Sequence, residues 1–169
     1  MKRLFIIVLL GMILSPGIAQ DSIPQEDFLE IQLEISGMNM DPEYTRIDIR
    51  PMYDSIIKDS AIVEVRYKPI KFVFPGKFAD IHYIIPKSIY DSILNMVYNL
   101  SYQKILKGND LCIWHDARYY RLKVSVSGIN TSVSIASPQI DPEKRKIVDY
   151  LYICKRIIRA ASLDEDVYF

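Results

Sequence analysis

Residues 29–35 read Leu-Glu-Ile-Gln-Leu-Glu-Ile, and this stretch decides the fold. Its apolar and polar side chains alternate with a period of two, which places one face of an extended strand in a core and the other face in water. The same alternation recurs over residues 45–50 and 63–67, and apolar residues over 70–74 and 79–85 predict two further strands. Short consecutive strands of this kind favour antiparallel pairing.

A first helix is predicted after these strands. Ser88 can cap its start, and Asp91, three residues later, would complete a capping box. Apolar side chains at helical spacing follow, and the helix should end near Ser101, because Gly108 and Asn109 indicate a loop soon afterwards. This pattern is typical of an amphipathic helix that packs on a sheet.

A hairpin and a second helix complete the predicted elements. Residues 120–126 and 132–135 alternate on either side of a turn, so the two segments should pair directly. The second helix should begin at Asp141, with Pro142 in its first turn. Its predicted apolar stripe consists of Ile147, Leu151, Cys154, Ile158 and Ala161.

These elements predict an α+β fold, in which an antiparallel β-sheet of several short strands packs two amphipathic helices on one face. A single domain is expected over residues 27–162, after a polar, flexible leader at 20–26. The acidic tail at 163–169 is expected to lie outside the fold.

The first 19 residues have the pattern of a cleaved signal peptide. Lys2 and Arg3 precede the apolar run 4–14, and the small residue Ala19 provides a cleavage position. The run is too short for a membrane-spanning helix, which needs about 20 apolar residues. We therefore expect export to the periplasm or the extracellular space, with no stable membrane insertion after cleavage.

The charge of the chain argues against nucleic acid as a partner. The chain has 21 basic and 21 acidic side chains, and removal of Lys2 and Arg3 leaves a net charge near −2. Binding to nucleic acid depends on clustered Lys and Arg. An unknown protein or glycan partner is expected instead.

The two cysteines leave two interpretations open. After export, Cys112 and Cys154 could form one disulfide. Alternatively, Cys154 lies on the apolar stripe of the second predicted helix, where a free thiol behaves as a small hydrophobic group.

Catalytic and metal-binding patterns are weak. Cys112, His115 and Asp116 are the residue types of a cysteine hydrolase, but on a strand Cys112 and His115 would point to opposite faces. An exported hydrolase built around these three residues remains an alternative. The only other histidine, His82, is expected to point outward, and a structural zinc site needs four ligands. The sequence has no phosphate loop or dinucleotide fingerprint, so neither a cofactor nor a metal is expected.

Tyrosine is unusually frequent, with 12 residues against one tryptophan, and tyrosine is enriched at binding surfaces. The candidate binding residues are aromatic and basic side chains near the hairpin and on one flank of the second helix: Trp114, His115, Arg118, Tyr119, Arg145, Tyr152, Arg156 and Arg159. A small-ligand carrier with a pocket lined by Tyr67, Tyr83 and Tyr120 is a further alternative. The sequence favours a small exported protein that acts by binding, with no chemistry of its own.

Overall fold

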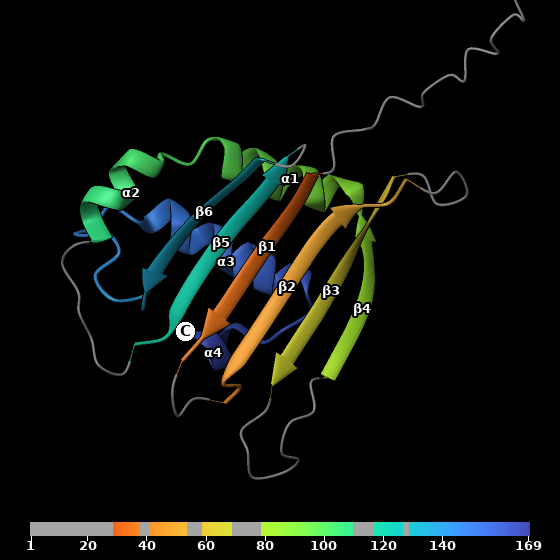
Figure 1. The fold of residues 1–169 in the computed structure, drawn as a ribbon, viewed down its shortest axis with the longest axis horizontal. Helices are drawn as coiled ribbons and strands as arrows, with labels where there is room; N and C mark the ends of the chain where they lie inside the picture. Colours follow the sequence, from red (N-terminus) through yellow and green to blue (C-terminus); the bar gives the residue numbers. More distant parts are fainter. Residues whose placement is uncertain (1–28, 38–40, 54–58, 69–78, 110–116, 127–128) are drawn as a thin grey trace, which may run out of the picture.

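The fold is described by a computed structural model that covers residues 29–37, 41–53, 59–68, 79–109, 117–126 and 129–169. Its centre is an antiparallel sheet of six strands in the order β4-β3-β2-β1-β5-β6 (Figure 1). The strands are β1 (Leu29–Ser36), β2 (Tyr44–Pro51), β3 (Ser60–Lys68), β4 (Ala79–Pro86), β5 (Tyr119–Val126) and β6 (Ile129–Ala136). The predicted α+β class and antiparallel sheet are confirmed.

The chain order explains the sheet order. Strands β1 to β4 form a meander, and the chain then passes through α1 (Lys87–Tyr98) and α2 (Tyr102–Asn109). It returns to the free edge of β1 as the hairpin β5–β6, followed by α3 (Val148–Ala160) and the short α4 (Glu165–Tyr168). The predicted pairing of the two hairpin segments is confirmed, and β1 lies between β2 and β5.

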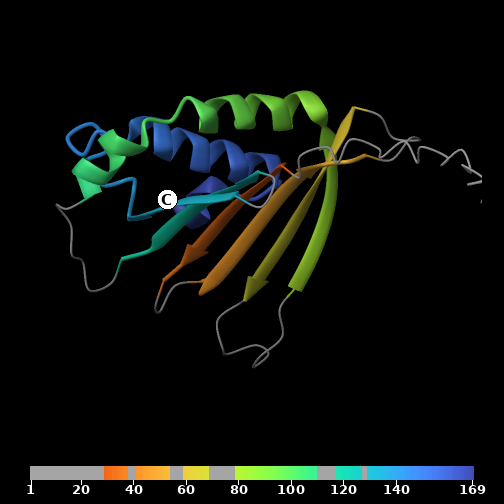
Figure 2. The same cartoon turned by 45° about the horizontal axis from the view of Figure 1, so that its top comes forward.

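The period-two pattern defines the core. Ile31, Leu33 and Ile35 of β1 are buried, and they belong to one hydrophobic cluster with Ile93 of α1 and Ile157 of α3. Helix α1 contacts both α3 and the strands β2 to β4, and Figure 2 shows α1 and α3 alongside each other over the sheet. Each fully buried aliphatic side chain of this cluster contributes about 1.5–3 kcal/mol relative to exposure.

The boundaries of α1 differ from the prediction. The helix begins at Lys87, and Pro86 at the N-cap position makes no side-chain capping bond. Asp91 does not complete a capping box, because its carboxylate accepts from Lys87 Nζ at 2.9 Å. The helix ends at Tyr98, earlier than predicted, and the segment expected to be a loop forms the separate helix α2.

The predicted start of the second helix was wrong by about two turns. Residues 141–146 form turns, and α3 begins only at Val148. Asp141 and Lys146 have φ angles of 47° and 57°, in the left-handed region that no right-handed helix contains. The buried guanidinium of Arg145 stabilises these turns by donating to the carbonyl oxygens of Ser137, Ile140 and Ala136.

The acidic tail packs into the domain, contrary to the expectation for residues 163–169. Tyr168 is only 6% exposed, and its backbone carbonyl accepts a hydrogen bond from the hydroxyl of Tyr120. Phe169 stacks on the Tyr120 ring with a centroid distance of 5.1 Å. The apolar residues that follow the acids therefore carry the tail back onto the core.

The predicted signal peptide, the leader and the strand at 70–74 lie outside the described residues. Among the helices that the structure describes, none is long and apolar enough to cross a membrane.

Candidate functional site

The candidate site is the face of the sheet opposite to the helices, toward which Figure 1 looks. Alternation places polar side chains from at least five neighbouring strands on it. We call these residues the polar face: Glu30, Gln32, Glu34, Arg46, Asp48, Arg50, Glu64, Arg66, Asp80, His82, Arg121 and Lys123.

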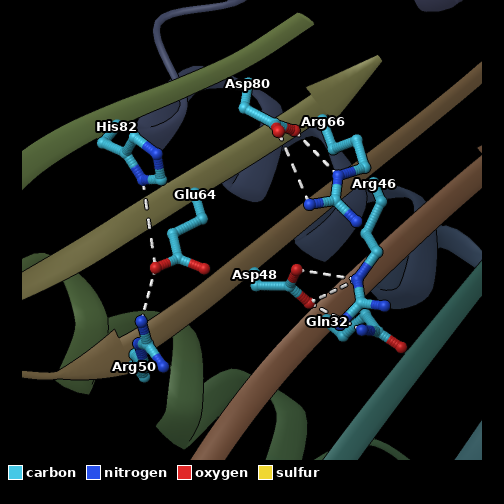
Figure 3. A network of polar contacts seen from close by, with 8 residues as sticks. All are labelled: Gln32, Arg46, Asp48, Arg50, Glu64, Arg66, Asp80 and His82. Carbon is cyan, nitrogen blue, oxygen red and sulfur yellow. Dashed lines mark hydrogen bonds and ion pairs between the residues drawn. The ribbon is translucent and has the colours of Figure 1, made fainter. Parts of the chain in front are cut away.

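The centre of the polar face is a buried acceptor with two donors (Figure 3). Asp48 accepts from Gln32 Nε2 at 2.6 Å, and its two carboxylate oxygens lie 3.0 and 2.7 Å from Arg46 Nε. Gln32 and Asp48 are both buried although they lie on the polar side of their strands. The hydrogen bond to Asp48 is the main reason that the pKa of Arg46 is raised.

Two further ion pairs extend this network toward β4. Arg66 Nε donates to Asp80 Oδ1 at 2.7 Å, and this bond is the main cause of the lowered pKa of Asp80. Glu64 pairs with the Arg50 guanidinium, and the same carboxylate oxygen lies 3.9 Å from His82 Nδ1. His82 points outward, as predicted.

The register places like charges directly opposite one another. Arg46 is the partner of Arg66 across β2 and β3, and Asp48 is the partner of Glu64. Like charges in directly opposite positions destabilise a sheet. Each of these four side chains forms an ion pair with an oppositely charged neighbour. These ion pairs compensate for the repulsion between the like charges.

Among the described residues, two of the hollows lie on the polar face. One, of about 150 Å³, is lined by Val65 and charged side chains: Arg46, Asp48, Glu64, Arg66, Asp80 and His82. The other, of about 370 Å³, lies over β1, β5 and β6 and is lined by Glu34, Ser36, Tyr119, Arg121 and Ser134. Both offer fixed hydrogen-bond donors and acceptors, which suit recognition of a polar ligand.

A third hollow lies on the other side of the molecule, between α1 and α3. It has a volume of about 790 Å³ and includes Met96, Leu100, Asp149, Tyr152 and Ile153 in its lining. Tyr152, one of the predicted binding residues, is about half exposed there.

The predicted binding residues near the hairpin do not form one surface among the described residues. Trp114 and His115 lie outside the described residues, as do Cys112 and Asp116 of the hydrolase alternative. Arg118 is buried, donates to the Val167 carbonyl at 2.6 Å and lies 5.7 Å from the Tyr168 ring centroid, so it contributes to the attachment of the tail. Tyr119 is 47% exposed and lines the hollow over β1, β5 and β6.

The predicted basic flank of the second helix is not a single surface. Arg145 precedes α3 and is 2% exposed, where it stabilises turns. Arg159 pairs with Glu165 of α4, and Arg156 is partly exposed. The flank fails as a prediction because its first member lies outside the helix, where helical spacing no longer applies.

Cys154 is a free thiol that is fully buried in the core, and Cys112, its partner in the predicted disulfide, lies outside the described residues. Burial raises the pKa of the Cys154 thiol. This burial agrees with the second interpretation of the sequence, in which the Cys154 thiol is a small hydrophobic group of the core.

The three tyrosines of the carrier alternative belong to the core. Tyr120 is fully buried, and Tyr67 and Tyr83 pack against the same hydrophobic cluster. Their inward direction follows from strand alternation.

Sequence reasoning missed the polar face as a unit. It found the alternation of each strand separately and placed the polar side chains of residues 29–35 in water. The missing information was strand order and register, which bring Gln32, Asp48 and Glu64 side by side. Within the described part of the chain, no group of three or more His, Cys, Asp or Glu side chains could hold a metal ion.

No model of a known protein family matches the chain, and no curated protein is significantly similar to it. The geometry of the polar face is therefore the basis on which a function is inferred.

Proposed function

We propose that this protein is an exported binding module that recognises a polar partner through the polar face and performs no chemistry of its own. The observation that carries the proposal is that like charges are register partners twice on the polar face, Arg46 opposite Arg66 and Asp48 opposite Glu64. Residues that break a local pairing rule, and that need ion pairs to compensate for it, are expected mainly at functional sites.

The network supports binding because it fixes its own side chains. Asp48 holds both Arg46 and Gln32, and Arg66 is held by Asp80. A partner would meet side chains that have already lost much of their rotamer freedom, which lowers the entropic cost of association. The exposed outer edges of Arg66 and Asp80 leave further donors and acceptors toward solvent.

Export supports a partner in the periplasm or outside the cell. This part of the proposal rests on residues 1–19, whose basic start, apolar run and small residue at Ala19 are typical of a signal peptide. Mass spectrometry of the protein from the envelope or medium should find Gln20 as the first residue. An intact Met1 in the mature protein would contradict export by cleavage.

The polar face is tested by exchanging the charges of one pair. The double variant R66D/D80R keeps an ion pair across β3 and β4 but reverses both signs. The matched control K87D/D91K exchanges an exposed pair on α1. Wild type and control should capture the same partner from envelope and medium after chemical cross-linking, and R66D/D80R should lose it.

Equal capture by all three proteins would overturn the assignment of binding to the polar face. Recovery of no partner by wild type under the same cross-linking would contradict the binding function itself. Circular dichroism of each variant checks that the fold is retained.

The hollow between α1 and α3 favours a small-ligand carrier as a second candidate. Its volume of about 790 Å³ lies within the range of about 300–1,000 Å³ that is usual for ligand sites. Tyr152→Ala would then weaken binding of a small molecule found by ligand-detected NMR, whereas R66D/D80R would not.

A further inference from the structure

Two tyrosines face each other across a serine at one end of the polar face. Ser36, the last residue of β1, is the register partner of Tyr44 on β2 and of Tyr119 on β5. Directly paired residues point to the same side of a sheet, and β2 and β5, which flank β1, are about 10 Å apart. The small Ser36 side chain therefore forms the floor between two aromatic side chains.

The next row of residues supplies polar groups beside this floor. Glu34 is the register partner of Arg121, and its Oε2 lies 3.5 Å from Arg121 Nη1. Arg121 is in turn opposite Ser134 of β6. These three residues, Ser36 and Tyr119 line the hollow of about 370 Å³.

The hollow combines the ring surface of Tyr119 with a hydrogen-bond donor, Arg121, and an acceptor, Glu34. Tyr119 is 47% exposed, so part of its ring is accessible to a ligand. Burial, and after it the charge of the Glu34 carboxylate, raises the pKa of the Tyr44 hydroxyl. Arg46 also lies opposite Glu34, so the carboxylate has cationic neighbours on both sides.

We propose that this hollow is a subsite for one pyranose ring of a glycan, with Tyr119 as the stacking surface and Glu34 and Arg121 as the groups that bind its hydroxyls. A pyranose has an apolar C–H face and a polar edge, so it needs an aromatic ring next to charged hydrogen-bonding groups. The Glu34 carboxylate can only accept hydrogen bonds, so it suits a ligand with donor groups, as the hydroxyls of a sugar are.

This inference rests on the proposed function and names its ligand class. The test measures binding of the purified protein to a glycan array, followed by NMR titration with chitotetraose, maltotetraose and cellotetraose as soluble probes. At least one array glycan should bind, and the titration should shift the amide signals of Ser36, Tyr119 and Arg121.

Matched variants assign the site. Tyr119→Ala should weaken binding about tenfold or more, because an aromatic contact and its buried area are lost. Tyr119→Trp should retain binding, and Glu34→Gln should weaken it by a similar factor through the loss of a charge-assisted hydrogen bond. The control Tyr98→Ala removes another exposed tyrosine, on α1, and should leave binding unchanged.

The proposal is overturned if no glycan binds to a protein whose NMR spectrum is that of a folded domain. It is also overturned if Tyr119→Ala and Glu34→Gln bind as wild type does. A captured protein partner that depends on Arg66 and Asp80 but is indifferent to Tyr119 would keep the proposed function and reject the saccharide subsite.

Discussion

Tyr120 and Tyr168 join the centre of the sheet to the end of the chain. The Tyr120 hydroxyl donates to the backbone carbonyl of Tyr168, although 48 residues separate them. The Tyr168 hydroxyl in turn lies 3.2 Å from Thr45 Oγ1 of β2. A tail that looks acidic and exposed in the sequence thus bridges β5 and β2 and closes one end of the core.

Tyr168→Ala should lower the free energy of unfolding by about 2–4 kcal/mol. It removes a buried ring, the hydrogen-bond partner of the Thr45 hydroxyl and the aromatic contact of the Arg118 guanidinium. Urea unfolding monitored by circular dichroism measures the change. Val167→Ala is the control, since this neighbouring side chain is about half exposed and should change stability by no more than about 0.5 kcal/mol. Equal stability of the two variants would show that the tail is not part of the cooperative unit.

The strands were predictable because their signal is local. Alternation over 29–35 and 120–126 identifies the strand and its inward side without knowledge of its neighbours. The α+β class and the β5–β6 pairing followed from the same pattern. The polar face was not predictable, because the contact of Gln32 with Asp48 depends on which strands pair and in what register.

The wrong start of α3 and the wrong placement of the tail have a shared cause. Asp141 and Pro142 are good residues for a helix start, and local propensity therefore predicted one. The structure uses them in turns because the Arg145 guanidinium binds three backbone carbonyls at this point, and such a tertiary contact leaves no periodic signal. The tail was missed for the same reason, since its burial depends on Arg118 and Tyr120.

Arg145→Ala should destabilise the protein by about 3 kcal/mol, because the carbonyl oxygens of Ser137, Ile140 and Ala136 would lose their charged donor in a buried site. Arg145→Lys should recover only part of this loss, because an ammonium group cannot reproduce the planar geometry. Lys144→Ala, at an exposed neighbouring position, is the control. Thermal and urea unfolding that give the same values for Arg145→Ala and Lys144→Ala would contradict the assigned role.

Cys154 should be unreactive toward thiol reagents in the folded protein. The side chain is fully buried, and burial raises its pKa, so little of the reactive thiolate forms. In a Cys112→Ser variant, modification by a disulfide reagent should be at least about 1,000-fold slower than in concentrated guanidinium chloride, since it requires unfolding. Rapid labelling without denaturant would show that the α3 core opens locally.

The Arg66–Asp80 pair predicts a dependence of stability on pH. The hydrogen bond from Arg66 lowers the folded-state pKa of Asp80 below its ordinary value of 3.8. A carboxyl group with a depressed folded-state pKa stabilises the fold above its unfolded pKa, and this contribution is lost as the pH falls through the folded value. The stability difference between wild type and Asp80→Asn should therefore be fully present above pH 3.8 and vanish at lower pH.

Carbon-detected NMR of the Asp80 carboxyl measures this directly, and Arg66→Gln should return its titration toward the ordinary value. High salt should also move the pKa of Asp80 toward its ordinary value, because the ion pair is exposed and salt screens its attraction. A carboxyl that titrates normally in wild type would contradict the pair as drawn in Figure 3. The variant R66D/D80R, which tests recognition, should also lose stability at low pH, because its reversed ion pair again contains an aspartate. A variant in which the pair is broken should not show this loss.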